Sequence, residues 1–359
     1  MIAAMLLACT FALSIQADTC YVDGNDKKQM IDGFGFSTAW SNELPAAKNN
    51  ALYGTLGMSL LRVRISETKY WGYETANSAA AHAAGAKVFG SPWSPPLTWK
   101  SNGVYVDGYL LPSHYGDYVD WLNSAIDSID LDYVSIQNES DNHAWCTWTP
   151  EQMLTFVRDY ASGLTKPVIM PEAIGFNDIM SDPVINDVNA VNNFAILGGH
   201  IYSHGPSVHS NALAHGKPVW MTEHFVASTQ TNMANCIAIA REMNECMNDQ
   251  MSAYVWWWVN EGDTSVNLVS NDGTIFKNGY TMGQFAKWVR PGKQRIASTY
   301  EPDSGVYVTA YRNGGWVIVA VNTTTSAVDQ PFVLSGSGLP TQFQAYRTSA
   351  TENMANIGK

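Results

Sequence analysis

Residues 133–141 read YVSIQNESD, and this stretch decides the fold. Its first residues are the aromatic and β-branched types of a buried strand, and polar residues follow at once, among them Asn138 and Glu139. Residues 218–224, PVWMTEH, have the same form and carry Glu223 near their end. Parallel α/β barrels place catalytic groups at the C-terminal ends of their strands, on one face. We therefore expect Glu139 and Glu223 to face each other across one cleft.

Strand-like segments recur along the chain, and helical patterns separate most of them. We predict helices over 113–129, 149–162 and 231–248, and short helices after the fifth and sixth strands. Eight strands with interleaved helices predict an α/β fold of the (β/α)8 or TIM-barrel type over residues 32–290. The eight predicted strands are 33–36, 58–65, 87–91, 133–137, 167–170, 196–202, 219–222 and 253–258.

The two ends of the chain show a different pattern. Residues 306–321 alternate with period two around the turn Arg312–Gly315, which is typical of a β-hairpin. Residues 18–31 read as a strand, a turn at Asp23-Gly24-Asn25 and a returning strand. We expect 18–31 to join 291–359 in a β-sandwich beside the barrel, built from both chain ends.

Residues 1–17 are apolar and end on a small residue, as a secretory signal peptide does, although the usual basic start is missing. We therefore expect a secreted, extracellular protein with no membrane-spanning segment. Four cysteines follow this segment, and their spacing fits no zinc site. Cys20, Cys146, Cys236 and Cys246 could form two disulfides, in any of three pairings, or stay as free thiols.

The composition of the 359-residue chain excludes some partners. The formal net charge is −12, so the chain repels phosphate backbones and nucleic acid is not expected to bind. The chain holds 13 Trp and 17 Tyr, more than packing alone usually needs. Aromatic faces that stack on sugars would explain the surplus.

Several ordered motifs make the chain resemble glycoside hydrolase family 30, in particular its bacterial glucuronoxylanase subfamily. The resemblance runs over almost all of the chain and implies a (β/α)8 barrel with a side β-sandwich. The motifs are Gly33-Phe34-Gly35, Leu61-Arg62-Val63, Ser91-Pro92-Trp93-Ser94-Pro95-Pro96, Ser135-Ile136-Gln137-Asn138-Glu139, Trp148-Thr149-Pro150, Trp220-Met221-Thr222-Glu223, Tyr254-Val255-Trp256-Trp257 and Phe285-Ala286-Lys287-Trp288-Val289-Arg290-Pro291-Gly292.

This resemblance implies that Glu139 is the acid/base and Glu223 the nucleophile of a retaining glycosidase. As the acid, Glu139 needs a pKa above that of Glu223. Arg62 lies at the end of the second strand, where it can keep Glu223 ionised, and Tyr202 ends the sixth strand, where it can donate a hydrogen bond to Glu223. Asn138 is expected to hold a sugar 2-hydroxyl.

The remaining candidates for substrate binding are His200 and four tryptophans expected to serve as sugar platforms. Each has an alternative as a packing group. Glu172 also ends a strand, but we assign it no role from the sequence. The four tryptophans are Trp93, Trp145, Trp257 and Trp258.

The chain departs from the subfamily in the loop after the eighth strand. The family pattern ends there on two arginine positions, and the subfamily uses an arginine of this loop to hold a glucuronate branch; this chain has Asn260 and Glu261 at the two positions. Phe225 stands at a tyrosine position that assists the same branch, whereas Ser228 matches a serine there. A carboxylate repels a uronate. We therefore predict an endo-β-1,4-xylanase that does not depend on glucuronate.

Three alternatives stay open: a glucuronoxylan-specific xylanase, another family 30 β-glycosidase such as a β-glucosidase or β-1,6-glucanase, and a non-catalytic xylan-binding protein. The expected ligands are xylan and xylooligosaccharides, and we expect a monomer. Two carboxylates suffice for the chemistry, so neither a metal nor an organic cofactor is predicted. The family usually has further strands after position 359, so the sandwich is expected to be small or C-terminally truncated.

Overall fold

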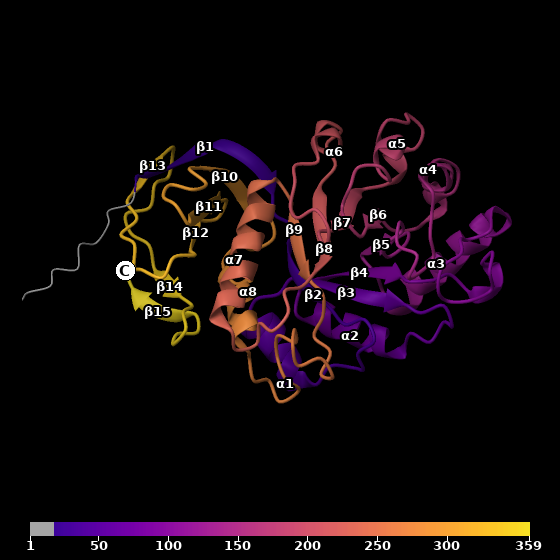
Figure 1. The fold of residues 1–359 in the computed structure, drawn as a ribbon, viewed down its shortest axis with the longest axis horizontal. Coiled ribbons are helices and arrows are strands. Elements are labelled where there is room, and N and C mark those ends of the chain that lie inside the picture. Colours follow the sequence, from indigo (N-terminus) through magenta and orange to yellow (C-terminus); the bar gives the residue numbers. More distant parts are fainter. Residues whose placement is uncertain (1–17) are drawn as a thin grey trace, which may run out of the picture.

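The structure is a computed structural model, and it describes residues 18–359. A closed barrel of eight parallel strands forms its centre, with helices around it (Figure 1). The predicted (β/α)8 barrel with a side β-structure is therefore confirmed. The barrel strands are β2 (Gly33–Ser37), β3 (Leu60–Ile65), β4 (Lys87–Pro92), β5 (Tyr133–Ser135), β6 (Val168–Ala173), β7 (Ile196–His200), β8 (Val219–His224) and β9 (Ala253–Trp256).

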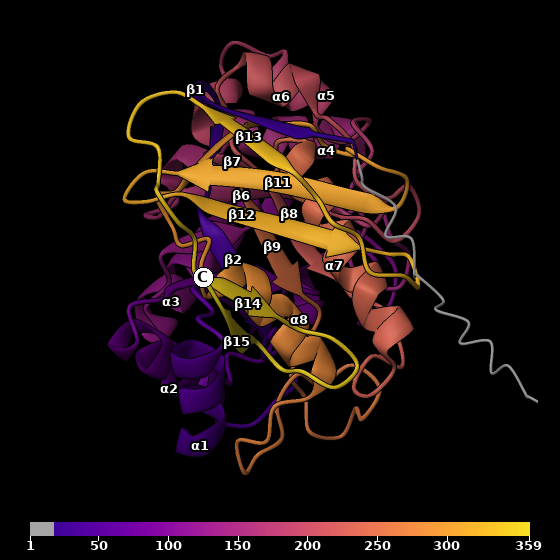
Figure 2. The ribbon, with the colours of Figure 1, turned by 90° about the vertical axis from the view of Figure 1, so that its left-hand side faces the viewer.

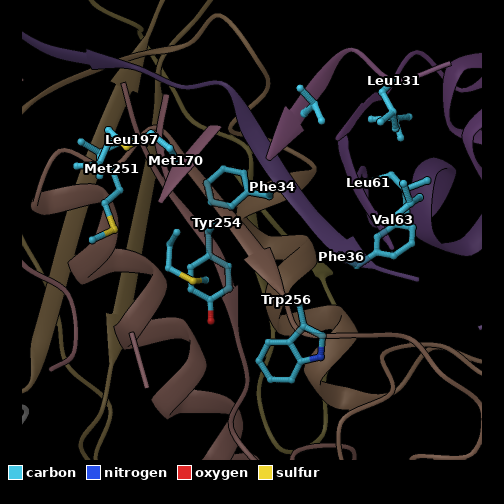
Figure 3. Packing of buried hydrophobic residues seen from close by; sticks show 14 of the residues in the cluster. Phe34, Phe36, Leu61, Val63, Leu131, Met170, Leu197, Met251, Tyr254 and Trp256 are labelled. Carbon is cyan, nitrogen blue, oxygen red and sulfur yellow. The ribbon is translucent and has the colours of Figure 1, made fainter. Parts of the chain in front are cut away.

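Alternation along the strands sorts the apolar side chains into two layers. One cluster fills the barrel interior and includes Leu60, Trp220 and Val255. Their neighbours along the chain, such as Leu61 and Tyr254, belong to the larger cluster between strands and helices (Figure 3). Successive side chains of a strand point to opposite faces. Position 62 therefore points inward, as position 60 does, and carries an arginine into the barrel mouth.

The outer helices differ in length around the barrel. Helix α4 begins with a capping box, in which Thr149 and Gln152 bond each other's backbone N–H, as its sequence predicts. Helices α5 and α6 are short, as expected. The helices are α1 (Ala46–Asn49), followed by a π-helical segment (Asn50–Thr55), α2 (Gly72–Ala83), α3 (Tyr115–Ile129), α4 (Pro150–Asp159), α5 (Asp182–Ile185), α6 (Ser210–Ala214), α7 (Met233–Asn248) and α8 (Lys277–Ala286).

Both ends of the described chain build the side β-structure, which Figure 2 shows from its outer face. One sheet has the order β12-β11-β10-β1-β13, and β14 and β15 form a separate pair. The predicted hairpin is the antiparallel pair β11–β12. The strands are β1 (Cys20–Met30), β10 (Gln294–Ser298), β11 (Val306–Arg312), β12 (Val317–Asn322), β13 (Phe332–Ser335), β14 (Ala345–Arg347) and β15 (Ala355–Gly358).

The predicted turn at Asp23-Gly24-Asn25 is wrong. Residues 20–30 form one strand, β1, which pairs with β10 and β13 on its two sides. The register of β1 against β10 shifts between Asp23 and Lys27 and again before Met30. Extra residues in a strand are absorbed as bulges, so turn-forming residues here bend the strand and do not reverse it.

The four cysteines of the described chain are free and buried, which answers the open question of their pairing within residues 18–359. Burial raises the pKa of Cys146 to about 12. No helix between residues 18 and 359 has the length and apolar character needed to cross a bilayer. The predicted signal peptide, residues 1–17, lies outside the described residues.

Candidate active site

Arg62 organises the mouth of the barrel from within. Its side chain is fully buried, and its nitrogens reach the ends of four other strands, with Nε donating to Ser91 Oγ (3.2 Å) on β4. Nη1 donates a short hydrogen bond to Glu223, Nη2 donates to Asn138 Oδ1 (2.7 Å), and Nη2 lies 3.3 Å from Glu172 Oε1. A buried guanidinium is tolerated only when its donors and its charge are matched. The arginine therefore holds the carboxylates of β6 and β8 in fixed positions.

Glu223 is bound on both oxygens. Arg62 binds Oε2, and Tyr202 donates its hydroxyl to Oε1 (2.9 Å). Burial and the charge of Glu223 raise the pKa of Tyr202, so this phenol stays protonated and remains a donor. Both predicted partners of Glu223 are thus in contact with it. These bonds fix the orientation of the Glu223 carboxylate.

Glu139 lies in the turn after β5, where its backbone has a positive φ of 46°. Such a conformation costs a non-glycine residue roughly 1–3 kcal/mol and persists where surrounding contacts enforce it. Here Glu139 Oε2 accepts from Asn142 Nδ2 (2.7 Å) and from Trp145 Nε1 (2.8 Å). The backbone N–H of Asn142 also donates to the Glu139 carbonyl (2.9 Å). The turn therefore presents the carboxyl group to the barrel mouth.

His200 joins the two glutamates. Its Nδ1 lies 3.3 Å from Glu139 Oε1 and 3.8 Å from Glu223 Oε1, and its Nε2 lies 3.7 Å from Glu172 Oε1. Burial lowers the pKa of His200, but the charge of Glu223, the hydrogen bond to Glu139 and the nearby carboxylate of Glu172 raise it more, to about 9. His200 is therefore a cation at neutral pH, in contact with both candidate catalytic groups.

The pKa of Glu139 is set by its hydrogen-bond partners as well as by burial. Burial raises it, but the hydrogen bond and charge of His200, with the bonds from Trp145 and Asn142, outweigh burial, and the pKa lies below its usual value. The reason is that the neighbouring imidazolium stabilises the carboxylate. An acid role for Glu139 therefore has to involve the proton on His200.

Glu172, to which the sequence assigned no role, belongs to the same network. It is fully buried, accepts a hydrogen bond from Ser91 Oγ (2.7 Å) and pairs with Arg62. Burial raises its pKa, but Arg62 and His200 lower it to about 2. The sequence held one sign of this role, namely that Glu172 lies at the end of a barrel strand. Glu172 is thus the counter-ion of both cations that contact Glu139 and Glu223.

Three groups here also have the spacing of a metal site. One ligand atom each from Glu139, His200 and Glu223 lies within 4.8 Å of the others. A metal binds neutral imidazole, however, and His200 is protonated at neutral pH with a pKa of about 9. A metal bound here would have to displace the proton of His200.

The predicted sugar platforms differ in their exposure. Trp93 is only 1% exposed and covers the guanidinium of Arg62 at 4.7 Å, so it presents no open face. Trp257 and Trp258 are half-buried and stack on each other at 5.0 Å. Trp40, which the sequence did not single out, contacts all four predicted platforms at ring distances of 4.7 to 6.5 Å.

The loop after β9 is held by a buried lysine. Lys48 is fully buried, and its Nζ donates to the carbonyl of Val259 (2.6 Å) and to Glu261 Oε2 (3.2 Å). Asn267 Nδ2 also donates to Glu261 Oε2 (3.2 Å). Burial lowers the pKa of Lys48, and Glu261 offsets this only in part. Glu261 thus serves as the counter-ion of a loop-anchoring lysine.

Two predicted positions lie in the loop after β8. Phe225 packs against the Tyr202 ring at 5.7 Å, next to the nucleophile candidate. Ser228 is exposed, has a positive φ of 56°, and its carbonyl accepts from Asn235 Nδ2 (3.2 Å). No side-chain hydrogen bond joins Ser228 to the carboxylate network within residues 18–359. The structure therefore brings Phe225 to the site and leaves Ser228 at the rim.

Comparison with known proteins places the chain among glycoside hydrolases. The family model described as glycosyl hydrolase family 59 matches residues 61–279. A glucuronoxylanase, XynC, of Bacillus subtilis strain 168 is 35% identical over 98% of this chain and 91% of its own length.

Two solved structures are similar over nearly the whole chain. The glycoside hydrolase family 30 subfamily 8 xylanase Xyn30A of Clostridium acetobutylicum has a TM-score of 0.90 and 34% identity, over 95% of this chain and 93% of its own. A family 30 endoxylanase of Clostridium papyrosolvens C71 has a TM-score of 0.88 and 35% identity, over 95% and 94%. These two matches include the side β-structure, which the family 59 match does not reach.

Proposed function

Because the chain belongs to glycoside hydrolase family 30, we propose that it is an endo-β-1,4-xylanase that retains the anomeric configuration and needs no glucuronate branch. Membership of the family makes the chain a glycoside hydrolase. The proposed substrate, xylan, is supported by relatives that are named as xylanases. The observation that carries the proposal is the buried pair Glu139 and Glu223, joined by His200.

The spacing of the pair supports retention. Retaining glycosidases hold their two carboxyl groups ~5–5.5 Å apart, whereas inverting enzymes leave ~6.5–9.5 Å for a water molecule. Oxygens of Glu139 and Glu223 approach within 4.8 Å. In the first step Glu223 attacks the anomeric carbon, the glycosidic C–O bond breaks, and a glycosyl ester forms on Glu223. Water cleaves that ester in the second step.

The pair Glu139 and His200 supplies the proton for the leaving oxygen. Because the two groups interact strongly, their shared proton is a property of the pair. It passes from His200 through Glu139 to the leaving oxygen. Esterification removes the negative charge of Glu223, which is one of the causes of the raised pKa of His200. The loss of that charge therefore favours release of the proton while the glycosyl ester forms. In the second step, the pair takes a proton from the water molecule that cleaves the ester.

Independence from glucuronate is supported by the charges of the rim. The loop 257–263 has no basic residue and carries Glu261 and Asp263. Lys48, the nearby cation, is buried and already bound to Glu261 and Val259. Phe225 offers no hydroxyl. A uronate would meet net negative charge there without a free donor of the bidentate kind that carboxylates prefer.

The proposal extends to location and partners. We propose that residues 1–17 direct secretion and that the mature enzyme acts as a monomer on xylan and xylooligosaccharides outside the cell. The net charge of −12 disfavours nucleic acid, and the described helices contain no membrane-spanning candidate. Neither a metal nor an organic cofactor is part of the proposed reaction.

A panel assay tests the proposal. Wild-type protein and Glu223→Gln are incubated with linear xylooligosaccharides, arabinoxylan, β-1,6-glucan and aryl β-glucosides, and new reducing ends are measured. We expect turnover on the xylans only, and its loss in the variant with binding retained. Turnover on the glucan or glucosides alone would favour another family 30 activity. Binding without turnover in the wild type would indicate a non-catalytic xylan-binding protein.

A further inference from the structure

We propose that a pocket beside the catalytic cleft, walled by Tyr70, Tyr73 and Trp40, is an additional subsite that binds an undecorated xylosyl unit remote from the cleaved bond. The proposal rests on the proposed xylanase function. The pocket has a volume of about 390 Å³ and lies between the loops after β2 and β3. This is within the roughly 300–1,000 Å³ of small-ligand sites.

Two exposed tyrosines form the outer wall. Tyr70 is 64% exposed and Tyr73 is 39% exposed, and their rings meet edge to face at 5.9 Å. Exposed aromatic groups rimmed by polar residues mark binding grooves. Tyrosine suits a sugar because its ring is apolar while its hydroxyl stays hydrated.

The turn that presents Tyr70 is rigidly built. Trp71 is only 6% exposed and donates its indole N–H to the Ser66 carbonyl (3.0 Å). The Lys69 N–H donates to the same carbonyl (3.1 Å), and the hydroxyls of Ser66 and Thr68 lie 2.9 Å apart. These bonds order the turn before ligand arrives, which lowers the entropic cost of binding. Ser66 and Thr68 both line the pocket, and we take their hydroxyls as the partners for sugar hydroxyls.

Trp40 connects the pocket with the reacting centre. It lines the pocket on one side and contacts Trp93 (4.7 Å) and Trp145 (6.2 Å) on the other. Trp145 donates to Glu139, and Trp93 covers Arg62, which binds Glu223. A polysaccharide bound across the two glutamates therefore meets Trp40 first and the tyrosine pair beyond it.

The charge of the pocket selects a neutral unit. Arg64 is its one basic lining residue, and its Nη2 donates to Glu67 Oε2 (2.7 Å). The guanidinium also stacks on Trp40 at 4.9 Å. Glu74 adds a second carboxylate to the lining. An anionic branch thus finds no unpaired cation here, whereas a pentosyl unit needs only the aromatic faces and hydroxyls.

Chain-length dependence tests the subsite. The double variant Tyr70→Ala/Tyr73→Ala, the ring-retaining variant Tyr70→Phe/Tyr73→Phe and the control Tyr21→Ala on the side sheet are compared with wild type on linear xylohexaose and on the shortest oligomer that wild type cleaves. We expect kcat/KM of the alanine variant on xylohexaose to fall about tenfold, mainly through KM, a change of ~1.4 kcal/mol. The shortest substrate and the other two variants should stay near wild type.

Binding measured without turnover separates this proposal from the proposed function. In a Glu223→Gln background, the alanine pair should weaken xylohexaose binding by a similar factor in titration calorimetry. An unchanged affinity, an equal loss on long and short substrates, or a loss confined to arabinoxylan would overturn the subsite while leaving the xylanase intact. Wild-type protein that neither binds nor cleaves any xylan would overturn both.

Discussion

Two buried cations, Arg62 and Lys48, lie near the barrel mouth, and their acidic partners differ in exposure to solvent. Arg62 binds Glu172 and Glu223, and all three side chains are buried. Lys48 is equally buried, but its partner Glu261 keeps 47% of its side chain exposed. A buried carboxylate that loses its charge leaves its cation uncompensated in low dielectric, whereas water replaces part of a carboxylate that is half exposed, as Glu261 is. We therefore propose that Arg62 and its two glutamates serve the chemistry, whereas Lys48 and Glu261 anchor the loop after β9.

The largest difference in activity is expected when the same substitution, Glu to Gln, is made in the buried Arg62 network and in the Lys48–Glu261 pair. Glu223→Gln should lower kcat by about 10⁴-fold or more, because it removes the nucleophile. Glu261→Gln, the matched control at the rim, should stay within about threefold of wild type on linear xylooligosaccharides, since surface groups away from the reacting atoms contribute little. Steady-state kinetics on purified, folded variants measure both. Equal losses would erase the proposed distinction.

A second substitution asks whether Glu172 acts through the cations that it holds. Glu172→Gln should lower kcat about 10²-fold and cost about 3–5 kcal/mol of stability, because Arg62 loses a buried partner. It should also move the alkaline limb of the pH–rate profile to lower pH, since Glu172 helps to raise the pKa of His200. A stability loss with an unmoved profile would limit Glu172 to a structural role.

The pH dependence of stability tests the charge of His200 directly. Its folded-state pKa is raised to about 9 from 6.5, so its stabilising contribution is complete below pH 6.5 and is lost as pH rises through 9. The expected loss is on the order of 3 kcal/mol across this window. Urea denaturation of wild type and His200→Gln at pH 6 and pH 9 measures it. A wild-type stability that does not fall more than that of the variant would contradict a cationic His200.

The smallest effect is expected at the rim. Glu261→Ala should cost about 1–2 kcal/mol of unfolding free energy, because Lys48 stays buried with only the Val259 carbonyl as partner. Its kcat/KM on linear xylooligosaccharides should change less than about twofold, or ~0.4 kcal/mol. Thermal unfolding and the same kinetics provide the measurements. A large loss of activity would move Glu261 from the loop anchor into the reacting centre.

Sequence reasoning predicted the barrel because period-two and helical patterns depend on neighbouring residues alone. It also found the strand-end groups Glu139, Glu223, Arg62 and Tyr202, because strand order brings them to one face. It predicted a turn in 18–31 that the structure resolves as a bulged strand, since only pairing with β10 and β13 keeps that segment extended.

Two properties of the site depend on distances that no local pattern carries. The direction of the Glu139 pKa depends on His200 lying 3.3 Å away, on a strand 61 residues later. The role of Glu172 depends on Arg62 and His200 both reaching it. Likewise, the contacts of Trp40 with other tryptophans form only because the fold brings the loops after β2, β4 and β9 together.

The central claim is that bond cleavage resides in the buried network and that the rim does not require a glucuronate. Mass spectrometry of the products from glucuronoxylan, beside a digest of linear xylohexaose, tests it most directly. We expect linear xylohexaose to be cleaved and the acidic products to carry their branch at several positions. Untouched xylohexaose, with every acidic product branched at one fixed position, would contradict the account.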